Sequence, residues 1–222
     1  MKIAINGKSG RMGKMLTGCI ADRTNGMVVV GMMDQPDVII DFSRPLATLS
    51  VLPFAIEHKI PMVIGTTGFL GTQQLQITHA SEKIPIVQSP NMSMGINLCI
   101  KALEQMTKHL MVMHPDMDVG ITEAHHNQKE DAPSGTALRL GQAVEAGGFK
   151  GEIQYTSLRL SDMPGEHAVI FALTGEQVIL KHRADSRLNF ALGAIRAAEW
   201  VIKQTTPGLY DMQPVLGLEN GK

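Results

Sequence analysis

The segment EAHHNQKEDAPSGTA, residues 123–137, holds the densest group of chemically active side chains in the chain. His125 and His126 come shortly before Lys129, and a Pro-Ser-Gly-Thr turn follows. Imidazole and ammonium groups can donate hydrogen bonds to an anion, and a histidine can move a proton near neutral pH. Three interpretations compete: a metal site, a charged surface loop, and a pocket for an anionic substrate.

The turn after these residues opens a helical stretch at residues 137–146. We expect Ser134 or a neighbour to cap this helix. The N–H groups of Gly135 and Thr136, left uncapped, would then form a site for a carboxylate or phosphate together with the Thr136 hydroxyl. Lys129 supplies a countercharge, so the anion pocket is favoured over the solvated loop.

A metal site is the weaker alternative. His125, His126, His167 and His182 offer possible ligands, but adjacent histidines on a strand point to opposite faces. The chain has neither an HExxH motif nor paired cysteines at a metal-binding spacing. We therefore expect no metal.

A second candidate site contains Gly7, Gly10 and Gly13, which lie between an expected strand at residues 2–6 and a helix at residues 12–22. Such a turn lets backbone N–H groups approach a pyrophosphate, whose charge the helix N-terminus favours. The G-x-x-G-x-x-G spacing differs from the standard G-x-G-x-x-G, and by itself it is more typical of a turn that binds nothing.

Asp34 makes a dinucleotide site the stronger interpretation. We expect it to end a buried second strand at residues 27–34, about 20 residues beyond the glycines, where an acid typically binds the ribose hydroxyls. The segments Gly65–Gly68 and Ser89–Met92 lie at the carboxyl ends of two later strands. In an open parallel sheet, ligands bind outside the carboxyl ends of the strands, so a cofactor is expected along both segments.

A parallel sheet is needed to bring these strand ends together, and the first half of the chain predicts one. Strands alternate with helices, and runs such as Val38–Ile40 and Met62–Ile64 lack the polar–apolar alternation of a half-exposed strand. The expected strands span residues 2–6, 27–34, 36–43, 61–68 and 84–91, with helices at residues 12–22, 47–59 and 73–83.

After Asn91 the pattern changes to a long helix at residues 94–109 and then to hairpin-forming strands, which predict a mixed or antiparallel sheet. These strands span residues 117–126, 153–160, 167–173 and 176–184. A last helix from residue 188, ending before Pro207, is expected to pack back on the first domain. The fold class is therefore α/β: a Rossmann-type parallel-sheet dinucleotide-binding domain (residues 1–93 and 188–222) and a smaller α+β substrate domain with a mixed sheet (residues 94–187).

Composition excludes several classes of protein. The formal net charge of −1 gives no global attraction to nucleic acid or an anionic membrane, and 44% hydrophobic residues is too many for a disordered chain. Cys19 and Cys99 are the only cysteines, so no disulfide framework is expected. The apolar run before Asn6 is too short for a signal peptide or a membrane span. We expect a cytoplasmic globular protein without nucleic-acid or membrane partners.

Several motifs, in this order along the chain, resemble the 4-hydroxy-tetrahydrodipicolinate reductase family of lysine and diaminopimelate biosynthesis. They are GKSGRMG, GTTG, SPNM, EAHHNQKEDAPSGTA, PGEH and HRADSRLNFALGA. The resemblance implies an oxidoreductase that uses NADPH or NADH to reduce a cyclic dicarboxylate imine to tetrahydrodipicolinate. It also implies a homotetramer that is joined through the sheets of the substrate domain.

The resemblance further implies a role for individual residues. His125 and Lys129 would be catalytic, although the sequence leaves open which of them delivers the proton. The substrate-binding residues would be His126, Gly135 and Thr136. The cofactor-binding residues would be Gly7, Lys8, Ser9, Gly10, Arg11, Met12, Asp34, Gly65, Thr66, Thr67, Ser89, Pro90, Asn91, Met92 and Arg187.

The chain departs from many relatives in the short segment between Asp34 and Asp37, which leaves cofactor preference open. An acid at position 34 repels a 2′-phosphate and favours NADH, whereas Lys8 and Arg11 could bind that phosphate. Two rival functions are a different oxidoreductase on the same scaffold and a nucleotide-binding regulatory protein. Neither rival needs the His-His-x-x-Lys and Ser-Gly-Thr arrangement.

Overall fold

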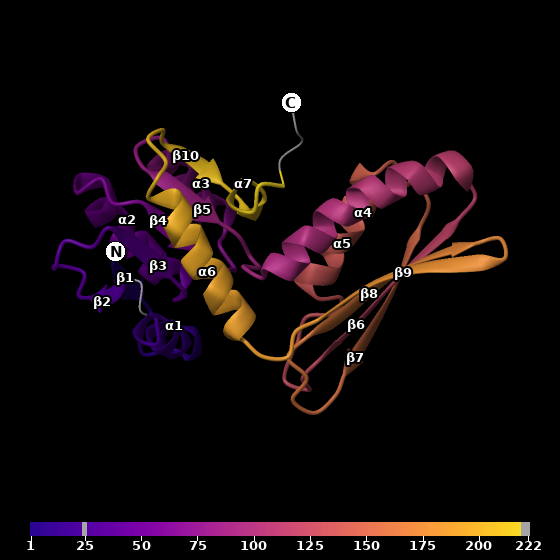
Figure 1. Ribbon diagram of the computed structural model, residues 1–222, viewed down its shortest axis with the longest axis horizontal. Helices are drawn as coiled ribbons and strands as arrows, with labels where there is room; N and C mark the ends of the chain where they lie inside the picture. Colours follow the sequence, from indigo (N-terminus) through magenta and orange to yellow (C-terminus); the bar gives the residue numbers. More distant parts are fainter. Residues whose placement is uncertain (24–25, 219–222) are drawn as a thin grey trace. The chain divides into compact units, whose positions relative to one another are not determined.

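The computed structural model describes residues 1–23 and 26–218 of the 222-residue chain. The chain divides into two compact units. Unit 1 comprises Met1–Met94 and Arg187–Lys222, and unit 2 comprises Gly95–Ser186. Figure 1 shows a sheet with helices in each of them.

Unit 1 is built on a six-stranded sheet in the order β10-β5-β4-β3-β1-β2, in which every neighbouring pair is parallel. The predicted parallel sheet is therefore confirmed. Its strands are β1 (Lys2–Asn6), β2 (Val28–Val30), β3 (Val38–Asp41), β4 (Met62–Ile64), β5 (Pro85–Gln88) and β10 (Gly208–Tyr210). The helices of this unit are α1 (Arg11–Ala21), α2 (Pro45–Glu57), α3 (Gly71–Ser81), α6 (Leu188–Val201) and α7 (Met212–Val215).

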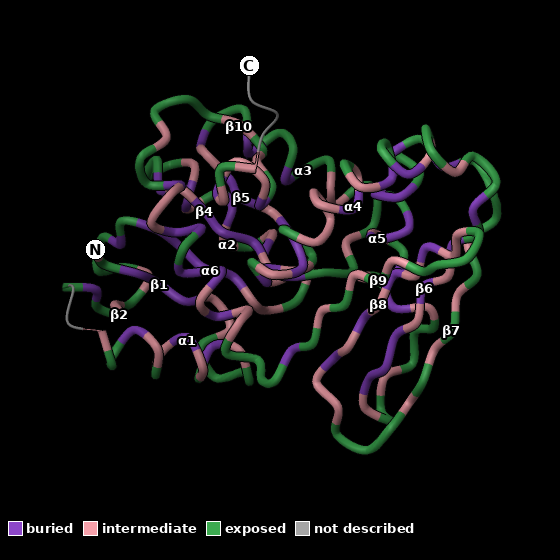
Figure 2. Tube along the Cα trace, turned by 45° about the vertical axis from the view of Figure 1, so that its right-hand side comes forward, coloured by how far each residue is buried: buried purple, intermediate pink, exposed green. Residues whose placement is uncertain are grey.

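Both faces of this sheet are covered. Alternate residues of β3 point to opposite sides: Val38 and Ile40 belong to a core with α1 and α6, while Ile39 belongs to a core with α2 and α3. All of β3 and β4 is buried, as the purple stretches of Figure 2 show. The strands lack alternation in sequence because neither face meets water.

The last helix, α6, packs on unit 1, as predicted. Ala191, Ala194 and Ala198 are fully buried, and Trp200 packs against the same core. A Cβ on Gly193 would lie 1.8 Å from the carbonyl oxygen of Met92. A glycine is therefore required where α6 touches the loop after β5.

The prediction for this sheet differs from the structure at both of its edges. The second strand was expected to be buried and to run to Asp34, but β2 ends at Val30 and lies at the sheet edge with no buried residue. The strand β10, at the opposite edge beside β5, was not predicted. Edge strands this short leave too few alternating positions for a pattern in sequence.

Unit 2 contains a four-stranded sheet in the order β7-β6-β8-β9. The pair β6–β7 is parallel and the other two pairs are antiparallel, so the predicted mixed sheet is confirmed. Its elements are α4 (Met94–Met113, whose first residue belongs to unit 1), β6 (Asp118–His125), α5 (Gly135–Ala146), β7 (Ile153–Arg159), β8 (Glu166–Leu173) and β9 (Glu176–Arg183).

Only one face of this second sheet is covered by helices of its own unit. Val119, Ile121 and Phe171 pack with residues of α4 and α5 in one core. Burial alternates along β7 and β9, because every second side chain points to the other, open face.

Within residues 1–23 and 26–218, no helix combines the length and the hydropathy that crossing a bilayer requires.

Candidate active site

The turn between β1 and α1 is shaped by its glycines. Gly7 has a φ of +83°, and the N–H of Gly10 donates to the carbonyl oxygen of Gly7 at 2.9 Å. A Cβ on Gly13 would lie 2.3 Å from that same oxygen and 2.5 Å from the Cα of Lys8. The helix therefore starts directly against the loop, as glycines at these positions are expected to allow.

The start of α1 fits a pyrophosphate. Gly10 is its N-cap and supplies no side-chain cap, and the first turn contains no acid. The exposed side chains of Lys8 and Arg11 lie on either side of this N-cap in the chain. Uncapped N–H groups at a helix start and nearby cations attract phosphate oxygens.

Asp34 does not lie at a strand end. It follows a turn after β2, where its carboxylate accepts a hydrogen bond from the N–H of Gly31 at 2.8 Å. The carboxylate thereby stabilises the turn after β2, and the Asp34 side chain is exposed. A carboxylate carries several lone pairs, so this bond leaves capacity for a ribose hydroxyl.

A buried aspartate at the end of β3 was not predicted as part of the site. Asp41 is fully buried and accepts hydrogen bonds from Asn6 (2.9 Å), from the N–H and hydroxyl of Ser43 (2.9 and 2.6 Å), and from the Thr66 hydroxyl (2.7 Å). These partners come from the ends of β1, β3 and β4. The only signal in sequence was an acid at the end of a strand that is otherwise apolar.

The predicted segments after β4 and β5 do lie at the carboxyl ends of neighbouring strands. However, the side chains of Thr66, Ser89 and Met92 are buried. Their contribution to any ligand site must therefore come mainly from the backbone. The Ser89 hydroxyl donates to the carbonyl oxygen of Asn91 at 2.9 Å, and this bond fixes the loop.

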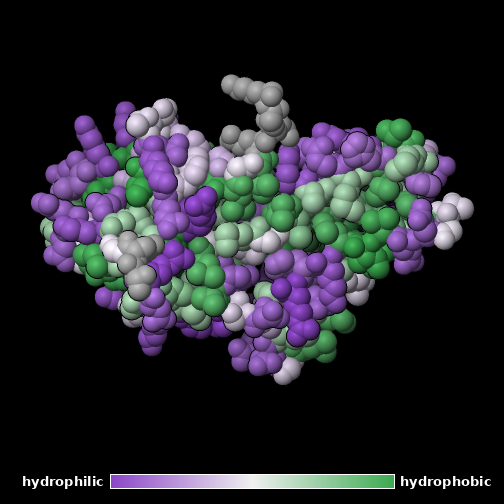
Figure 3. All heavy atoms as spheres, in the orientation of Figure 1, coloured by the Kyte–Doolittle hydropathy of each residue, from purple (hydrophilic) through white to green (hydrophobic). Residues whose placement is uncertain are grey.

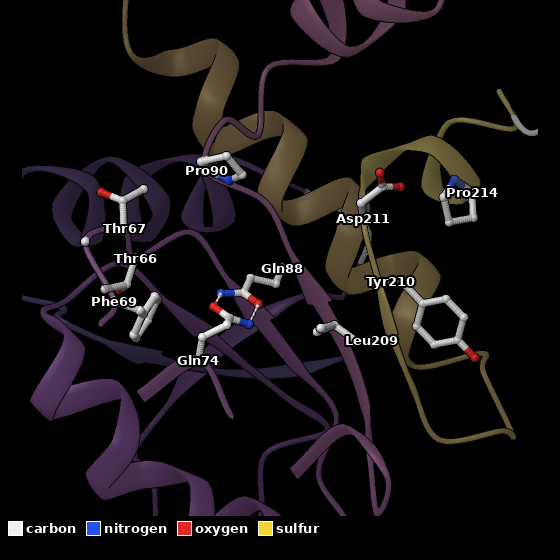
Figure 4. Close-up of a pocket in the computed structure, with 11 residues that line it drawn as sticks. Thr66, Thr67, Phe69, Gln74, Gln88, Pro90, Leu209, Tyr210, Asp211 and Pro214 are labelled. Carbon is white, nitrogen blue, oxygen red and sulfur yellow. Dashed lines mark hydrogen bonds between the residues drawn. The ribbon is translucent and has the colours of Figure 1, made fainter. Parts of the chain in front are cut away.

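Beside these segments lies a cavity of about 750 Å³, drawn in Figure 4. Thr66, Thr67 and Pro90 line one side of it and Leu209 the other. Between them the amides of Gln74 and Gln88 face each other and exchange two hydrogen bonds of 2.8 and 3.0 Å. Arg187 is exposed at the N-cap of α6 and does not line this cavity.

In unit 2, Ser134 caps α5 as predicted. Its hydroxyl accepts the N–H of Ala137 at 3.2 Å and lies 3.1 Å from Nε2 of His167. Since the hydroxyl oxygen accepts from Ala137, its hydrogen is available to donate to His167. The histidine of the PGEH motif therefore supports the helix start that was predicted to bind an anion.

The side chains of His125 and Arg159 converge on Glu123 at the end of β6. Its buried carboxylate contacts Nδ1 of His125 and receives both Nη groups of Arg159 at 2.9 and 2.8 Å. An ionised carboxylate only accepts, so Nδ1 of His125 carries a hydrogen. A Cβ on Gly165, whose φ is +143°, would lie 3.1 Å from Nε2 of His125.

Lys129 is positioned by an ion pair. Its ammonium lies 2.6 Å from the Asp131 carboxylate, and its side chain is 22% exposed. The same carboxylate receives the N–H of Gly135, and together these hydrogen bonds lower the pKa of Asp131. The expectation of an uncapped start at Gly135 is therefore wrong, because an internal anion already occupies it. Thr136 also has a partner.

Two of the histidines of unit 2, His125 and His167, are in ring contact. The rings of His125 and His167 meet edge to face at 5.0 Å, and Nδ1 of His126 is buried with no hydrogen-bond partner among the described residues. In the parts of the chain that the structure describes, no group of three His, Cys, Asp or Glu side chains could hold a metal ion.

Burial and hydrogen bonding shift the pKa of each group around Glu123. Burial would raise the pKa of Glu123, but hydrogen bonds from Arg159, Ser157 and His125 lower it to about 2. Burial lowers the pKa of His125 against the opposing effect of Glu123. Burial and the nearby His125 lower the pKa of His167 to about 4. At neutral pH the cluster therefore holds a carboxylate, a guanidinium and neutral imidazoles.

Two family models match the chain. The model for the N-terminus of dihydrodipicolinate reductase matches residues 29–92, and the model for its C-terminus matches residues 95–216. A curated 4-hydroxy-tetrahydrodipicolinate reductase from Hahella chejuensis (strain KCTC 2396) is 39% identical over 269 aligned positions. That alignment covers 98% of this chain and 99% of the relative. The 269 aligned positions exceed the 222 residues of this chain, so the relative carries segments that this chain lacks.

Solved structures show the same fold. A dipicolinate-bound dihydrodipicolinate reductase from Paenisporosarcina sp. TG-14 superposes with a TM-score of 0.77 at 24% identity, covering 97% of this chain and 99% of that one. A diaminopimelate dehydrogenase from Corynebacterium glutamicum in complex with diaminopimelate gives a TM-score of 0.53 at 14% identity, covering 99% and 96%.

Proposed function

This chain belongs to the 4-hydroxy-tetrahydrodipicolinate reductase family of NAD(P)H-dependent oxidoreductases, and from this premise we propose which of its residues carry the reduction. The reaction of the family yields tetrahydrodipicolinate in lysine and diaminopimelate biosynthesis. Its substrate carries two carboxylates on one ring, so the site must supply donors at two points.

Unit 1 holds the cofactor in this proposal. The backbone from Gly7 to Met12 and the start of α1 bind the pyrophosphate, and Asp34 binds a ribose hydroxyl. The segments Gly65–Thr67 and Ser89–Met92 lie along the nicotinamide, and Arg187 contacts the cofactor from the start of α6. Bound NAD(P)H supplies the hydride.

Unit 2 binds the ring through its carboxylates. One observation carries this assignment: the Asp131 carboxylate already lies on the Lys129 ammonium and the Gly135 N–H. The Lys129 ammonium and the Gly135 N–H are therefore already placed to donate to one carboxylate. A substrate carboxylate takes the place of Asp131 there, with Thr136 and His126 as further donors. The dipicolinate bound to the fold neighbour is a planar ring of the same kind.

Lys129 delivers the proton and His125 accepts a hydrogen bond. Because Nδ1–H of His125 is directed at Glu123 and burial lowers the pKa of this histidine, its Nε2 is an acceptor at neutral pH. An ammonium, in contrast, has three hydrogens to donate. Loss of water from C4 leaves a double bond there, and when a hydride is supplied to C4, Lys129 would give its proton to the ring carbon at the other end of that bond.

A coupled assay tests the activity directly. The unstable substrate is generated in place by the preceding synthase, and the consumption of NADH and NADPH is followed by absorbance. We expect oxidation of at least one of them that depends on both the synthase and this enzyme. If neither NADH nor NADPH is consumed, the proposed reductase activity is refuted.

Replacing Asp34 by alanine should raise the Kd for NADH about 10-fold, the cost of one hydrogen bond to a charged group. The Kd for NADPH should change less, because the carboxylate repels a 2′-phosphate. Titration of both nucleotides by fluorescence measures the two constants. Asp37→Ala is the matched control, since Asp37 is also exposed and accepts one backbone N–H, that of Lys2 at 2.7 Å. A larger loss for NADPH than for NADH would show that Asp34 does not contact the ribose.

We further infer that copies of the chain cover the open face of the unit 2 sheet and form a homotetramer. Leu158 and Ile179 point outward there and are 49% and 54% exposed, and Ile170 pairs with Ile179 across β8 and β9. Hydrophobic residues, green in Figure 3, also reach the surface of this unit in that view. Exposed apolar side chains on a sheet face that no helix of its own unit covers are typical of an interface.

Ile179→Lys should convert the tetramer into smaller species, because it buries a charge in the interface. Light scattering coupled to size-exclusion chromatography gives the mass. Val112→Lys serves as the control, since Val112 is 84% exposed on α4, away from this face. A wild-type monomer, or an unchanged tetramer in the Ile179 variant, would contradict the interface. We place the enzyme in the cytoplasm, in keeping with its free thiols at Cys19 and Cys99.

A further inference from the structure

Glu123 is the most deeply buried carboxylate of the described part of unit 2, and each of its oxygens has two partners. Its Oε2 contacts His125 and the Nη1 of Arg159, while its Oε1 contacts the Nη2 of Arg159 and the N–H of Ser134 at 3.3 Å. The residue is 3% exposed. The carboxylate therefore joins the end of β6, the end of β7 and the start of α5.

Arg159 extends the cluster to the loop that carries Lys129. Its Nε donates to the carbonyl oxygen of Lys129 at 3.2 Å, and its Nη2 donates to that of Asp131 at 2.5 Å. The guanidinium therefore donates to the backbone on both sides of Glu130, and its two Nη groups also donate to the Glu123 carboxylate. In the parallel β6–β7 register Arg159 pairs with His125, which places both next to the carboxylate.

An ion pair between a buried carboxylate and a partly buried guanidinium, with side chains 1% and 19% exposed, calls for a reason other than stability. Removing two charges from water is costly, and well-packed apolar residues often serve a core as well or better. The partners of this pair, however, are the ring of His125, the backbone of Lys129 and the cap of α5 just before Gly135. The substrate contacts assigned above from three separate segments are thus tied to one pair.

We propose that Glu123 and Arg159 are positioning residues of the reductase, which fix the Nε2 of His125 and the ammonium of Lys129 relative to the start of α5. This inference rests on the proposed function. Glu123 sets the tautomer and orientation of His125, as a carboxylate next to a histidine does in other active sites. Arg159 sets the path of the loop at Lys129. Displacement of a reacting group by 1 Å can lower a rate about 10²-fold.

A purely structural ion pair predicts something different. Its loss would lower stability, but each folded molecule would turn over at the wild-type rate. Kinetics on folded protein therefore separate the two roles, and a signature from the imidazole shows whether Glu123 acts through His125.

The first test compares Glu123→Gln with Glu104→Gln. Glu104 also lies in unit 2 and is paired with Lys101 at 3.0 Å, but it contacts no proposed substrate residue. A glutamine has one acceptor oxygen, for which His125 and Arg159 must compete. We expect kcat to fall about 10- to 100-fold in Glu123→Gln, with the KM for NAD(P)H unchanged, and neither to change in Glu104→Gln.

The tautomer gives a readout that does not depend on activity. In protein with ¹⁵N-labelled histidine, nitrogen shifts at neutral pH should report hydrogen on Nδ1 of His125 in the wild type. Glu123→Gln should lose that preference, and Glu104→Gln should keep it. Wild-type kcat and an unchanged tautomer in folded Glu123→Gln would overturn the proposal.

The second test uses Arg159, in case Glu123→Gln does not fold. Arg159→Lys keeps the charge but loses the fork, and it should lower kcat with little effect on the KM for the cofactor. In Arg159→Ala, guanidinium chloride at non-denaturing concentrations should restore part of the turnover, because the side chain it replaces is 19% exposed. Full turnover of Arg159→Lys would overturn the proposal. Absence of turnover in both wild type and Glu104→Gln would instead refute the proposed function itself.

Discussion

Lys129→Ala should lower kcat by roughly 10²- to 10⁴-fold, the usual loss when a positioned acid is removed. The Kd for NAD(P)H should stay unchanged, because every cofactor contact proposed here lies in unit 1 and Lys129 lies in unit 2. The variant should also fold, since the ammonium pairs with the half-exposed Asp131 and packs in no hydrophobic core. Steady-state kinetics and a nucleotide titration on the same preparation measure both effects.

Lys101→Ala is the control for this substitution. Lys101 lies in the same unit, has a side chain 19% exposed and pairs with Glu104 at 3.0 Å. Lys101→Ala therefore also removes a partly buried lysine from an ion pair, as Lys129→Ala does. Its turnover should equal that of the wild type. If Lys129→Ala retains full turnover, Lys129 is not the acid. If it loses nucleotide binding, the separation of roles between the two units is wrong.

The free energy of unfolding should decrease as the pH falls from about 6.5 to about 4, because of the buried His167. The pKa of His167 is lowered to about 4 by burial and by His125, whereas an unfolded histidine has a pKa of 6.5. Between these two pH values His167 is protonated in the unfolded chain but stays neutral in the folded chain, so a lower pH favours unfolding. The full shift corresponds to about 3 kcal/mol, of which about 2 kcal/mol is lost by pH 5.

The structural cause is the contact with Ser134. Protonated Nε2 could no longer accept the Ser134 hydroxyl at 3.1 Å, and the charge would lie in a 5% exposed site beside His125. The pKa values of His125 and His182 are also lowered by burial, so they add to the loss in the same direction.

Denaturant unfolding at pH 7.5, 6 and 5 measures this dependence in the wild type, His167→Gln and His109→Gln. The glutamine at 167 keeps an acceptor for Ser134 but cannot take up a proton in this range. Its unfolding free energy should fall less with pH than that of the wild type. His109 is exposed on α4, and its variant should follow the wild type. Parallel curves for wild type and His167→Gln would show that His167 is protonated alike in both states.

The sequence alone determined the features that depend on near neighbours in the chain. The glycine turn before α1 and the Ser134 cap of α5 each follow from residues a few positions apart. The buried runs of β3 and β4 identified a sheet covered on both faces. The order and spacing of the motifs also identified the family, which the comparisons confirmed. The cofactor and substrate roles of individual residues remain predictions.

The tertiary structure decided which distant groups share a site. Glu123 and Arg159 are 36 residues apart, and their ion pair depends on the register of β6 and β7. Asp41 collects donors from three strand ends, and Asp131 folds back onto Lys129 and Gly135. Caps and periodicity are set by local backbone geometry, which a sequence displays directly. Pairing across a sheet depends on how whole elements pack, so the partners of Glu123 became known only once the strands lay side by side.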